Sequence, residues 1–183
     1  RARGAPQPGR LHCTTGGPHL QATSGPARLL WETDRPTSAI VEWGETEEFG
    51  QRAELGADGK RVRRFDLPGL KPDTVYRYRV TLDDGAYRLQ TPVFAIRTAP
   101  PTGAPVVFAA ISDTEARPHV SAHVGGLVWR ETPQFMINAG DLTDGGKLPH
   151  RAEWTHEYLP ALAPLKARIP VLPVMGNGED DIV

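Results

Sequence analysis

Three polar side chains in the second half of this 183-residue chain directly follow apolar runs. They are Asp113, Asp141 and Asn177. Carboxylate and amide oxygens are hard donors, which suit divalent or trivalent metal ions. If the apolar runs are parallel strands, their carboxyl ends meet at one edge of a sheet, where open α/β sheets bind ligands. The sequence therefore predicts an oxygen-rich metal site at that edge.

The surrounding pattern predicts the sheet that such a site needs. We expect strands over 106–112, 134–140 and 169–177, with helices over 119–131 and 150–167 between them. The run at 106–112 is continuously apolar, which is typical of a strand buried on both faces. Gly125-Gly126 weakens the first helix, and Pro173 argues against a central strand. Strands that alternate with helices indicate an α/β domain with a parallel sheet.

The first half of the chain has the pattern of an all-β domain. Strand-forming residues cluster at 27–33, 38–44 and 74–80, between turn residues. In the last of these runs, tyrosines alternate with arginines, as expected of a strand with one buried face. The basic run at 60–67 is interpreted as a solvated or edge strand protected by charge, not as a functional basic patch.

Proline, glycine and composition divide the chain into segments. We expect a disordered lead-in at 1–17, a β-sandwich domain at 18–98, a linker at 99–105 and an α/β domain at 106–183. His12, Cys13 and His19 lie in or beside the lead-in and are interpreted as inert.

The overall charge excludes some classes of partner. Lys plus Arg number 21 and Asp plus Glu number 22, so the net charge is −1. This balance gives no electrostatic reason to expect nucleic acid or an anionic membrane as a partner. The single cysteine forms no internal disulfide, and no apolar run approaches the ~18 residues of a membrane span.

A short motif in the first half resembles a known module. Leu70, Pro72, Thr74 and Tyr76 form a Leu-x-Pro-x-Thr-x-Tyr run that leads into a strand, as in fibronectin type III domains. The resemblance implies a seven-strand sandwich. It also implies that the Tyr76 hydroxyl bonds back to the backbone a few residues upstream and that Trp31 is buried in the core.

The three strand ends also form an ordered set of motifs. Ser112-Asp-Thr-Glu, Gly140-Asp-Leu-Thr and Gly176-Asn-Gly-Glu resemble the metallophosphoesterase superfamily, the calcineurin-like and purple acid phosphatase group. The spacings, 113 to 141 and 141 to 177, each fit one helix and its loops. A fibronectin-like domain ahead of such a domain is similar to the purple acid phosphatase arrangement.

The resemblance implies a binuclear metal centre that hydrolyses a phosphate ester through an activated water. Asp113 would bind the first metal, Asp141 would bridge both metals, and Asn177 would bind the second. The ions would be Fe, Mn or Zn.

Three positions depart from the family pattern. Gly178 stands where the family has a histidine that orients substrate and assists the leaving group. Asp144 stands where the purple enzymes have a tyrosine, so we expect no tyrosinate–iron colour, and it is interpreted as a turn residue. Glu115 stands where the Asp-x-His motif has its histidine, and could bind metal through oxygen instead of nitrogen.

Other interpretations of these residues stay open. Asp113 and Asp141, taken singly, fit helix N-caps equally well. Glu179 is a weak catalytic candidate beside Gly178. With Asp180 and Asp181, it fits equally the cap of a following helix or a solvated turn. The histidine pairs His119/His123 and His150/His156 match no family motif and are interpreted as solvated or packing residues.

Three functional hypotheses follow. The first is that the chain is the amino-terminal part of a secreted or periplasmic metallophosphoesterase, inactive alone because the family's later histidine ligands would lie beyond Val183. The second is a pseudoenzyme or binding protein that works through its fibronectin-like domain, which Gly178 favours. The third keeps the enzyme but makes it a diesterase, because a good leaving group needs less acid assistance.

Overall fold

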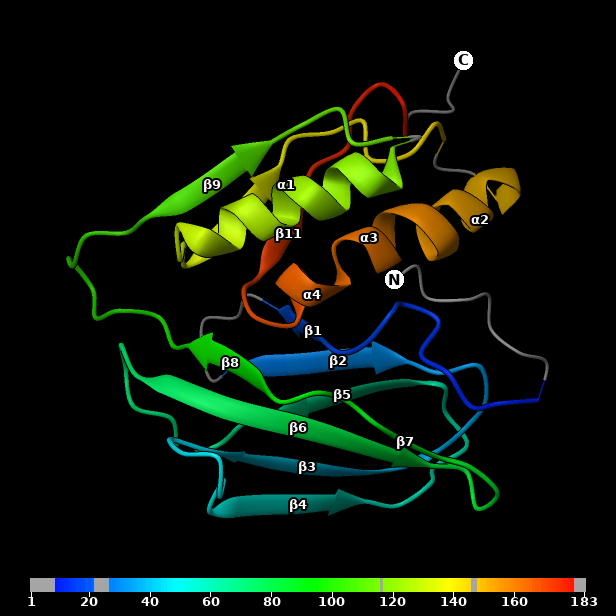
Figure 1. The fold of residues 1–183 in the computed structure, drawn as a ribbon, viewed down its shortest axis with the longest axis vertical. Helices are drawn as coiled ribbons and strands as arrows, with labels where there is room; N and C mark the ends of the chain where they lie inside the picture. The colour runs from blue at the N-terminus through cyan, green and yellow to red at the C-terminus, as the bar shows by residue number, and fades with distance from the viewer. Residues whose placement is uncertain (1–8, 22–26, 116, 146–147, 180–183) are drawn as a thin grey trace.

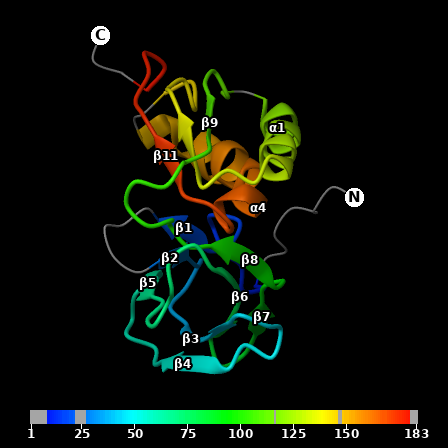
Figure 2. The same ribbon diagram turned by 90° about the vertical axis from the view of Figure 1, so that its left-hand side faces the viewer.

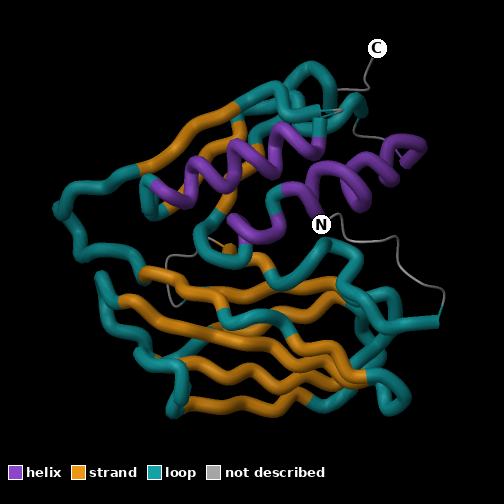
Figure 3. The backbone as a smooth tube through the Cα atoms, in the orientation of Figure 1, coloured by secondary structure: helices purple, strands orange, loops and turns teal. Residues whose placement is uncertain are grey.

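The chain folds into a β-sandwich with an α/β part stacked on it (Figures 1 and 3). The computed structural model describes residues 9–21, 27–115, 117–145 and 148–179. The sandwich precedes the α/β part in the sequence, and the segment between β8 and β9 joins them along one side (Figure 1). The predicted fold class, an all-β sandwich followed by α/β, is therefore confirmed.

In the described part of the chain, eight strand segments build the sandwich. One antiparallel sheet contains β1 (His19–Gln21), β2 (Arg28–Glu32) and β5 (Val62–Asp66). The other contains β3 (Ser38–Gly44), β4 (Gln51–Leu55), β6 (Val75–Asp83), β7 (Arg88–Gln90) and β8 (Phe94–Arg97). β3 pairs along one edge of β6, so β7 and β8 share the other edge. The eight segments thus fill seven strand positions.

The predicted alternation in β6 is confirmed. Tyr76, Tyr78 and Val80 are buried in the sandwich core, whereas Arg77 and Arg79 are more exposed. Trp31 is completely buried in the same core, as expected. The backbone N–H of Lys71 donates to the Tyr76 hydroxyl at 3.0 Å, which is the expected tyrosine corner.

The expectation of a disordered lead-in is wrong for residues 9–17, while residues 1–8 lie outside the described part. Leu11 is 6% exposed and belongs to the sandwich core. Cys13 forms an isolated bridge with Thr33 at the end of β2. His19 is buried, with its Nε2 3.0 Å from the carbonyl oxygen of Thr15. The segment expected to be disordered from its Pro and Gly content is held on the sandwich by Leu11 and by backbone pairing.

Three parallel strands form the sheet of the α/β part. They are β9 (Phe108–Ile111), β10 (Phe135–Asn138) and β11 (Val171–Pro173), in the order β11-β10-β9. Within the described residues β11 pairs only with β10, so Pro173 lies in an edge strand, where a missing backbone donor is tolerated. The ladder resumes beyond it, because Val174 N donates to Asn138 O.

The first predicted helix is confirmed as α1 (Pro118–Arg130). Gly125 is buried on the face of α1 that packs against the second helical region. A Cβ there would lie 3.2 Å from Cδ2 of Leu162, so the glycine permits the close approach.

The second predicted helix is a series of short segments instead of one helix. They are η1 (Leu148–His150), α2 (Arg151–Glu153), the π-helical η2 (Trp154–Tyr158), α3 (Leu159–Ala161) and α4 (Ala163–Lys166). In η2 the N–H of Leu159 bonds to the carbonyl of Trp154, five residues back. Pro160 and Pro164 have no N–H to continue a regular ladder, which explains the interruptions.

The helices cover only one face of the parallel sheet (Figure 2). Met136 of β10 is fully buried against them, with Leu162 and Leu165. On the opposite face Phe108 is 54% exposed and stacks on Phe135, so the expectation of a first strand buried on both faces is wrong.

Several side chains join the sandwich to the α/β part, among them Tyr78 and Arg168. The hydroxyl of Tyr78 donates to the carbonyl of Ala167 at 2.7 Å. Burial raises the pKa of Tyr78, against a smaller opposing effect of Arg168, so the hydroxyl keeps its proton. The Arg168 guanidinium lies over the rings of Phe94 and Trp129.

None of the described helices is long and apolar enough to cross a membrane.

Candidate metal centre

The ends of β9 and β10 are tied together by backbone hydrogen bonds. Asp113 N donates to Gly140 O at 3.1 Å, and Thr114 N donates to Asp141 O at 2.7 Å. The two loops that follow the strands therefore run side by side. This pairing brings the predicted ligands Asp113 and Asp141 to one edge of the sheet.

Three carboxylates meet at this edge. Asp113, Glu115 and Asp141 each offer an oxygen, and these oxygens lie within 4.8 Å of one another. In the described part of the chain, no other group of three His, Cys, Asp or Glu side chains comes as close. None of the three carboxylates forms an ion pair with a described Lys, Arg or His. The cluster has the donors and the uncompensated negative charge of a cation site.

Both aspartates of the cluster have a left-handed backbone. Asp113 has φ of +55° and Asp141 has φ of +52°. Aspartate adopts this region more readily than most residues, but at a cost that proteins usually bear at functional sites. Gly140 has φ of +95°, and a Cβ there would lie 2.7 Å from Cα of Gly176. A glycine is therefore required for the close approach of the second and third strand ends.

The third strand end docks directly on Asp141. Gly178 N donates to Asp141 Oδ1 at 2.8 Å, and a side chain at Gly176 would collide with the same carboxylate. Asn177 lies between these two glycines with an exposed side chain. The structure thus brings the turn that carries Asn177 to the edge occupied by Asp113 and Asp141.

Glu179 holds the second and third strand ends together through hydrogen bonds. Its Oε1 accepts from the backbone amides of Leu142 and Thr143, and its Oε2 accepts from those of Asp141 and Gly176. Burial alone would raise the pKa of Glu179, but these four amides outweigh it and hold the pKa below its usual value. The carboxylate therefore stays ionised and joins two strand ends.

The geometry corrects the suggestion that Glu179 replaces the missing catalytic histidine. Its side chain is only 5% exposed, and the four amides occupy the lone pairs of both oxygens. A carboxylate held in this way has no site left for exchanging a proton with a substrate. We assign Glu179 a structural role.

There is little space for a side chain at Gly178, where the family motif has a histidine. A Cβ at Gly178 would lie 2.9 Å from the carbonyl oxygen of Thr143 and 3.1 Å from Asp141 Oδ1. The loop must shift before any side chain fits there. No general acid stands at this position.

The N-cap interpretation of the two aspartates is wrong. The N-cap of α1 is Arg117, four residues after Asp113. No described helix begins after Asp141 before Leu148. Both aspartates instead lie in loops at the sheet edge.

The other candidate residues contribute no second cluster within the described residues. His119, His123, His156 and Asp144 are exposed. His150 Nδ1 lies 2.9 Å from Glu153 Oε1. Asp180 and Asp181 lie outside the described residues.

Sequence reasoning missed a polar network beneath the cluster. Asn138 is completely buried, and its Nδ2 donates to Thr114 Oγ1 at 3.2 Å and lies 3.5 Å from the Tyr158 hydroxyl. Ser121 Oγ donates to the carbonyl of Thr114 at 3.2 Å. Thr114, which separates Asp113 from Glu115, is therefore held on both sides. The one signal in the sequence was a polar residue within the apolar run of β10.

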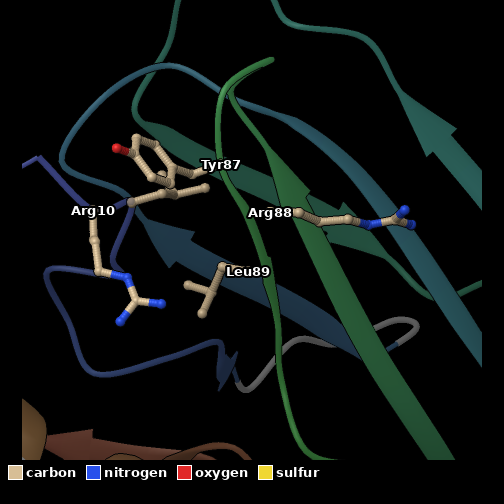
Figure 4. Close-up of a pocket in the computed structure, with 5 residues that line it drawn as sticks. Arg10, Tyr87, Arg88 and Leu89 are labelled. Atoms are coloured by element: carbon tan, nitrogen blue, oxygen red, sulfur yellow. The ribbon is translucent and has the colours of Figure 1, made fainter.

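A groove elsewhere in the molecule has no connection with this chemistry. It has a volume of about 330 Å³ and lies on the sandwich, lined by Arg10, Leu11, Tyr87, Arg88 and Leu89 (Figure 4). The Arg88 side chain points away from Arg10 (Figure 4). The two arginines therefore do not converge on one ligand.

Comparisons with known proteins agree with this reading of the strand ends. Residues 106–182 match the family of calcineurin-like phosphoesterases. No curated protein sequence matches the chain. Among solved structures, the chain is similar to the purple acid phosphatase PPD1 from seeds of yellow lupin (Lupinus luteus). The TM-score is 0.66 and the identity 13%, over 87% of this chain and 34% of that one.

A second similar structure is that of PhoD. Its TM-score is 0.64 and its identity 18%, over 94% of this chain and 40% of PhoD. The chain thus spans well under half the length of either structure, and identities this low establish the shared fold alone. The family match and the motifs at three adjacent strand ends agree: residues 106–182 match the calcineurin-like phosphoesterase family, in a part of the chain that follows a β-sandwich.

Proposed function

We propose that the protein hydrolyses phosphate mono- or diesters at a binuclear metal centre built on Asp113, Asp141 and Asn177. One observation carries the proposal. Two aspartates in left-handed conformations stand at adjacent parallel strand ends, with a third carboxylate within 4.8 Å of both. In the described part of the chain, none of these carboxylates caps a helix or forms an ion pair.

The donors fit the ions that the family implies. Asp113 and Asp141 supply carboxylate oxygens and Asn177 an amide oxygen. The buried Oε2 of Glu115 has no hydrogen-bond partner in the part of the chain that the structure describes. Two bound cations would neutralise the charge of a phosphate ester and lower the pKa of a bound water. The metal identity, among Fe, Mn and Zn, stays a prediction.

The residues around the donors position them. Glu179 fixes the amides of Asp141 and Gly176, so the second and third strand ends move together. The contact between Gly178 N and Asp141 Oδ1 orients that carboxylate and leaves its second oxygen for a ligand. Asn138 holds Thr114 and thereby the loop that carries Asp113.

The absence of a general acid at residue 178 should affect which phosphate esters are hydrolysed fastest. Without a side chain at residue 178, leaving-group protonation from this position is lost, which typically costs on the order of 10²–10⁴ in rate. Esters with good leaving groups lose least. We therefore expect aryl esters, and diesters among them, to be better substrates than alkyl monoesters.

The test compares variants of the full-length protein with Mn²⁺, Fe or Zn²⁺ and aryl and alkyl esters. Asp141→Asn should reduce turnover at least about 10³-fold, because it removes the bridging charge. Asp144→Asn is the matched control, because Asp144 is an exposed carboxylate three residues further along. Equal activity in the wild type and Asp141→Asn would refute the proposal.

The rival function, a binding protein without catalysis, rests on Gly178. Its distinguishing result is tight metal binding without turnover of any ester. Restoring the histidine with Gly178→His is a poor discriminator, because even a Cβ at this position meets the carbonyl oxygen of Thr143. Inactivity of the 183-residue chain alone and export from the cytoplasm stay predictions.

A further inference from the structure

Glu115 has a buried carboxylate oxygen without a partner among the described residues. Its Oε2 is inaccessible to solvent and forms no hydrogen bond with any of them. Nearly all buried polar atoms in folded proteins are hydrogen-bonded, and an unpaired buried charge is strongly unfavourable. Four other buried polar atoms of the described residues share this state, but only Glu115 contributes a carboxylate, and it stands in the cluster with Asp113 and Asp141.

The protein itself offers no such partner among the described residues. Glu115 does not cap α1, whose N-cap is Arg117 and whose N-terminus has no side-chain cap. No described basic side chain pairs with it, whereas Asp113 and Asp141 contribute two further negative charges within 4.8 Å. A cation would satisfy the oxygen and remove the mutual repulsion at once.

The backbone keeps Glu115 at the cluster. Its N–H donates to the carbonyl of Asp141 at 3.2 Å, next to the shorter bond from Thr114 N at 2.7 Å. The loop from Asp113 to Glu115 is thus paired with the residue expected to bridge the metals. These two bonds fix the backbone of Glu115 beside the cluster.

We propose that Glu115 is a ligand of the first cation, with Asp113 and Asp141, and that it gives this site a preference for hard ions such as Mn²⁺ or Mg²⁺ over Zn²⁺. The inference rests on the proposed metal site and specifies its selectivity. Carboxylate donors suit Mg²⁺ and Mn²⁺, whereas imidazole nitrogen suits Zn²⁺. The histidine that the sequence motif would have here would supply that nitrogen.

The test measures metal binding by calorimetry in the full-length protein after removal of metal by a chelator. Glu115→Gln should weaken Mn²⁺ binding at least about tenfold, since loss of a mere outer-sphere partner already costs ~10–100-fold. Glu115→His should raise the ratio of Zn²⁺ to Mn²⁺ affinity. Glu131→Gln, in an exposed residue just after α1, is the control and should change neither.

Thermal unfolding separates ligation from a structural role. In chelator, Glu115→Gln should raise the melting temperature, because it removes an unpaired buried charge and a repulsion. With Mn²⁺ present, the same variant should show a smaller metal-induced rise than the wild type. A variant that melts earlier both with and without metal would overturn the inference.

The outcomes distinguish this inference from the proposed function. If Asp141→Asn abolishes Mn²⁺ binding while Glu115→Gln and Glu115→His bind like the wild type, Glu115 is not a ligand and the proposed site stands. If Asp141→Asn also binds Mn²⁺ normally, the site itself is wrong and both proposals fail.

Discussion

Glu179 shows how one side chain joins two strand ends of the site. Its two oxygens accept four backbone amides, from residues 141–143 and from Gly176. Hydrogen bonds to a charged group are stronger than those between neutral groups, and each orphaned amide carries a desolvation penalty. The carboxylate therefore stabilises the loops that present Asp141 and Asn177.

Glu179→Gln should lower the free energy of unfolding by about 2–4 kcal/mol, because an amide accepts through one oxygen only. The amides of the other oxygen are left without an acceptor. Chemical denaturation measures the change, with Glu131→Gln as the exposed control. A Glu179→Gln variant as stable as that control would show that the four bonds contribute nothing.

Glu179 should also make the stability of the folded protein depend on pH in the acid range. The pKa of Glu179 is lower in the folded protein than its ordinary value of 4.5. Its contribution to stability is therefore fully present above pH 4.5 and is lost as the pH falls through the lower folded value. In Glu179→Gln this part of the acid sensitivity should disappear.

Helix α1 shows how an element is positioned by its glycines. Gly126 is exposed, and a Cβ there would touch nothing within 4 Å. Gly125 is buried, and its Cβ would press on Cδ2 of Leu162, which is completely buried. The two neighbours have the same helix propensity and opposite packing environments.

Gly126→Ala should stabilise the protein by up to about 1 kcal/mol, the usual difference in helix propensity. Gly125→Ala gains the same propensity but must displace a packed leucine, so it should be less stable than Gly126→Ala. Thermal unfolding of the pair is the measurement. A larger gain for Gly125→Ala would mean that α1 and Leu162 do not pack as described.

The elements also show how far the sequence predicts the fold. The strand runs, α1 and the edge position of β5 follow from local pattern, and the structure has them close to the expected ranges. The helical region after Asp141 does not follow from local pattern. Its sequence predicts one helix, but prolines and a π-helical turn interrupt it. The role of Glu179 was not predictable either, since three of its four partners lie 36 to 38 residues away.

At the scale of the whole molecule, a buried lysine lies where the α/β part meets the sandwich. Lys166 of α4 is 7% exposed, with its Nζ 5.5 Å from the ring centroid of Tyr158, and α4 contacts β1. Burial lowers the pKa of Lys166 to about 7, from 10.5. Burial, and to a smaller extent Lys166, lower the pKa of His19 in β1 to about 3.

These shifts predict how stability depends on pH. Between pH 7 and 10.5 the unfolded chain binds a proton at Lys166 that the folded protein does not, so stability should rise with pH across this window. Lys166→Met should flatten the rise, whereas Lys60→Met, in an exposed turn, should not. Denaturation at pH 7 and pH 10 measures it; an unchanged slope in Lys166→Met would contradict the burial of a neutral amine.

The central claim is that three strand ends form one metal site, and anomalous X-ray scattering from Mn²⁺-loaded crystals of the full-length protein tests it most directly. We predict one anomalous peak in contact with Asp113 and Asp141, and a second in contact with Asp141 and Asn177. A metal-loaded, catalytically competent crystal with no anomalous peak at Asp141 would contradict the account.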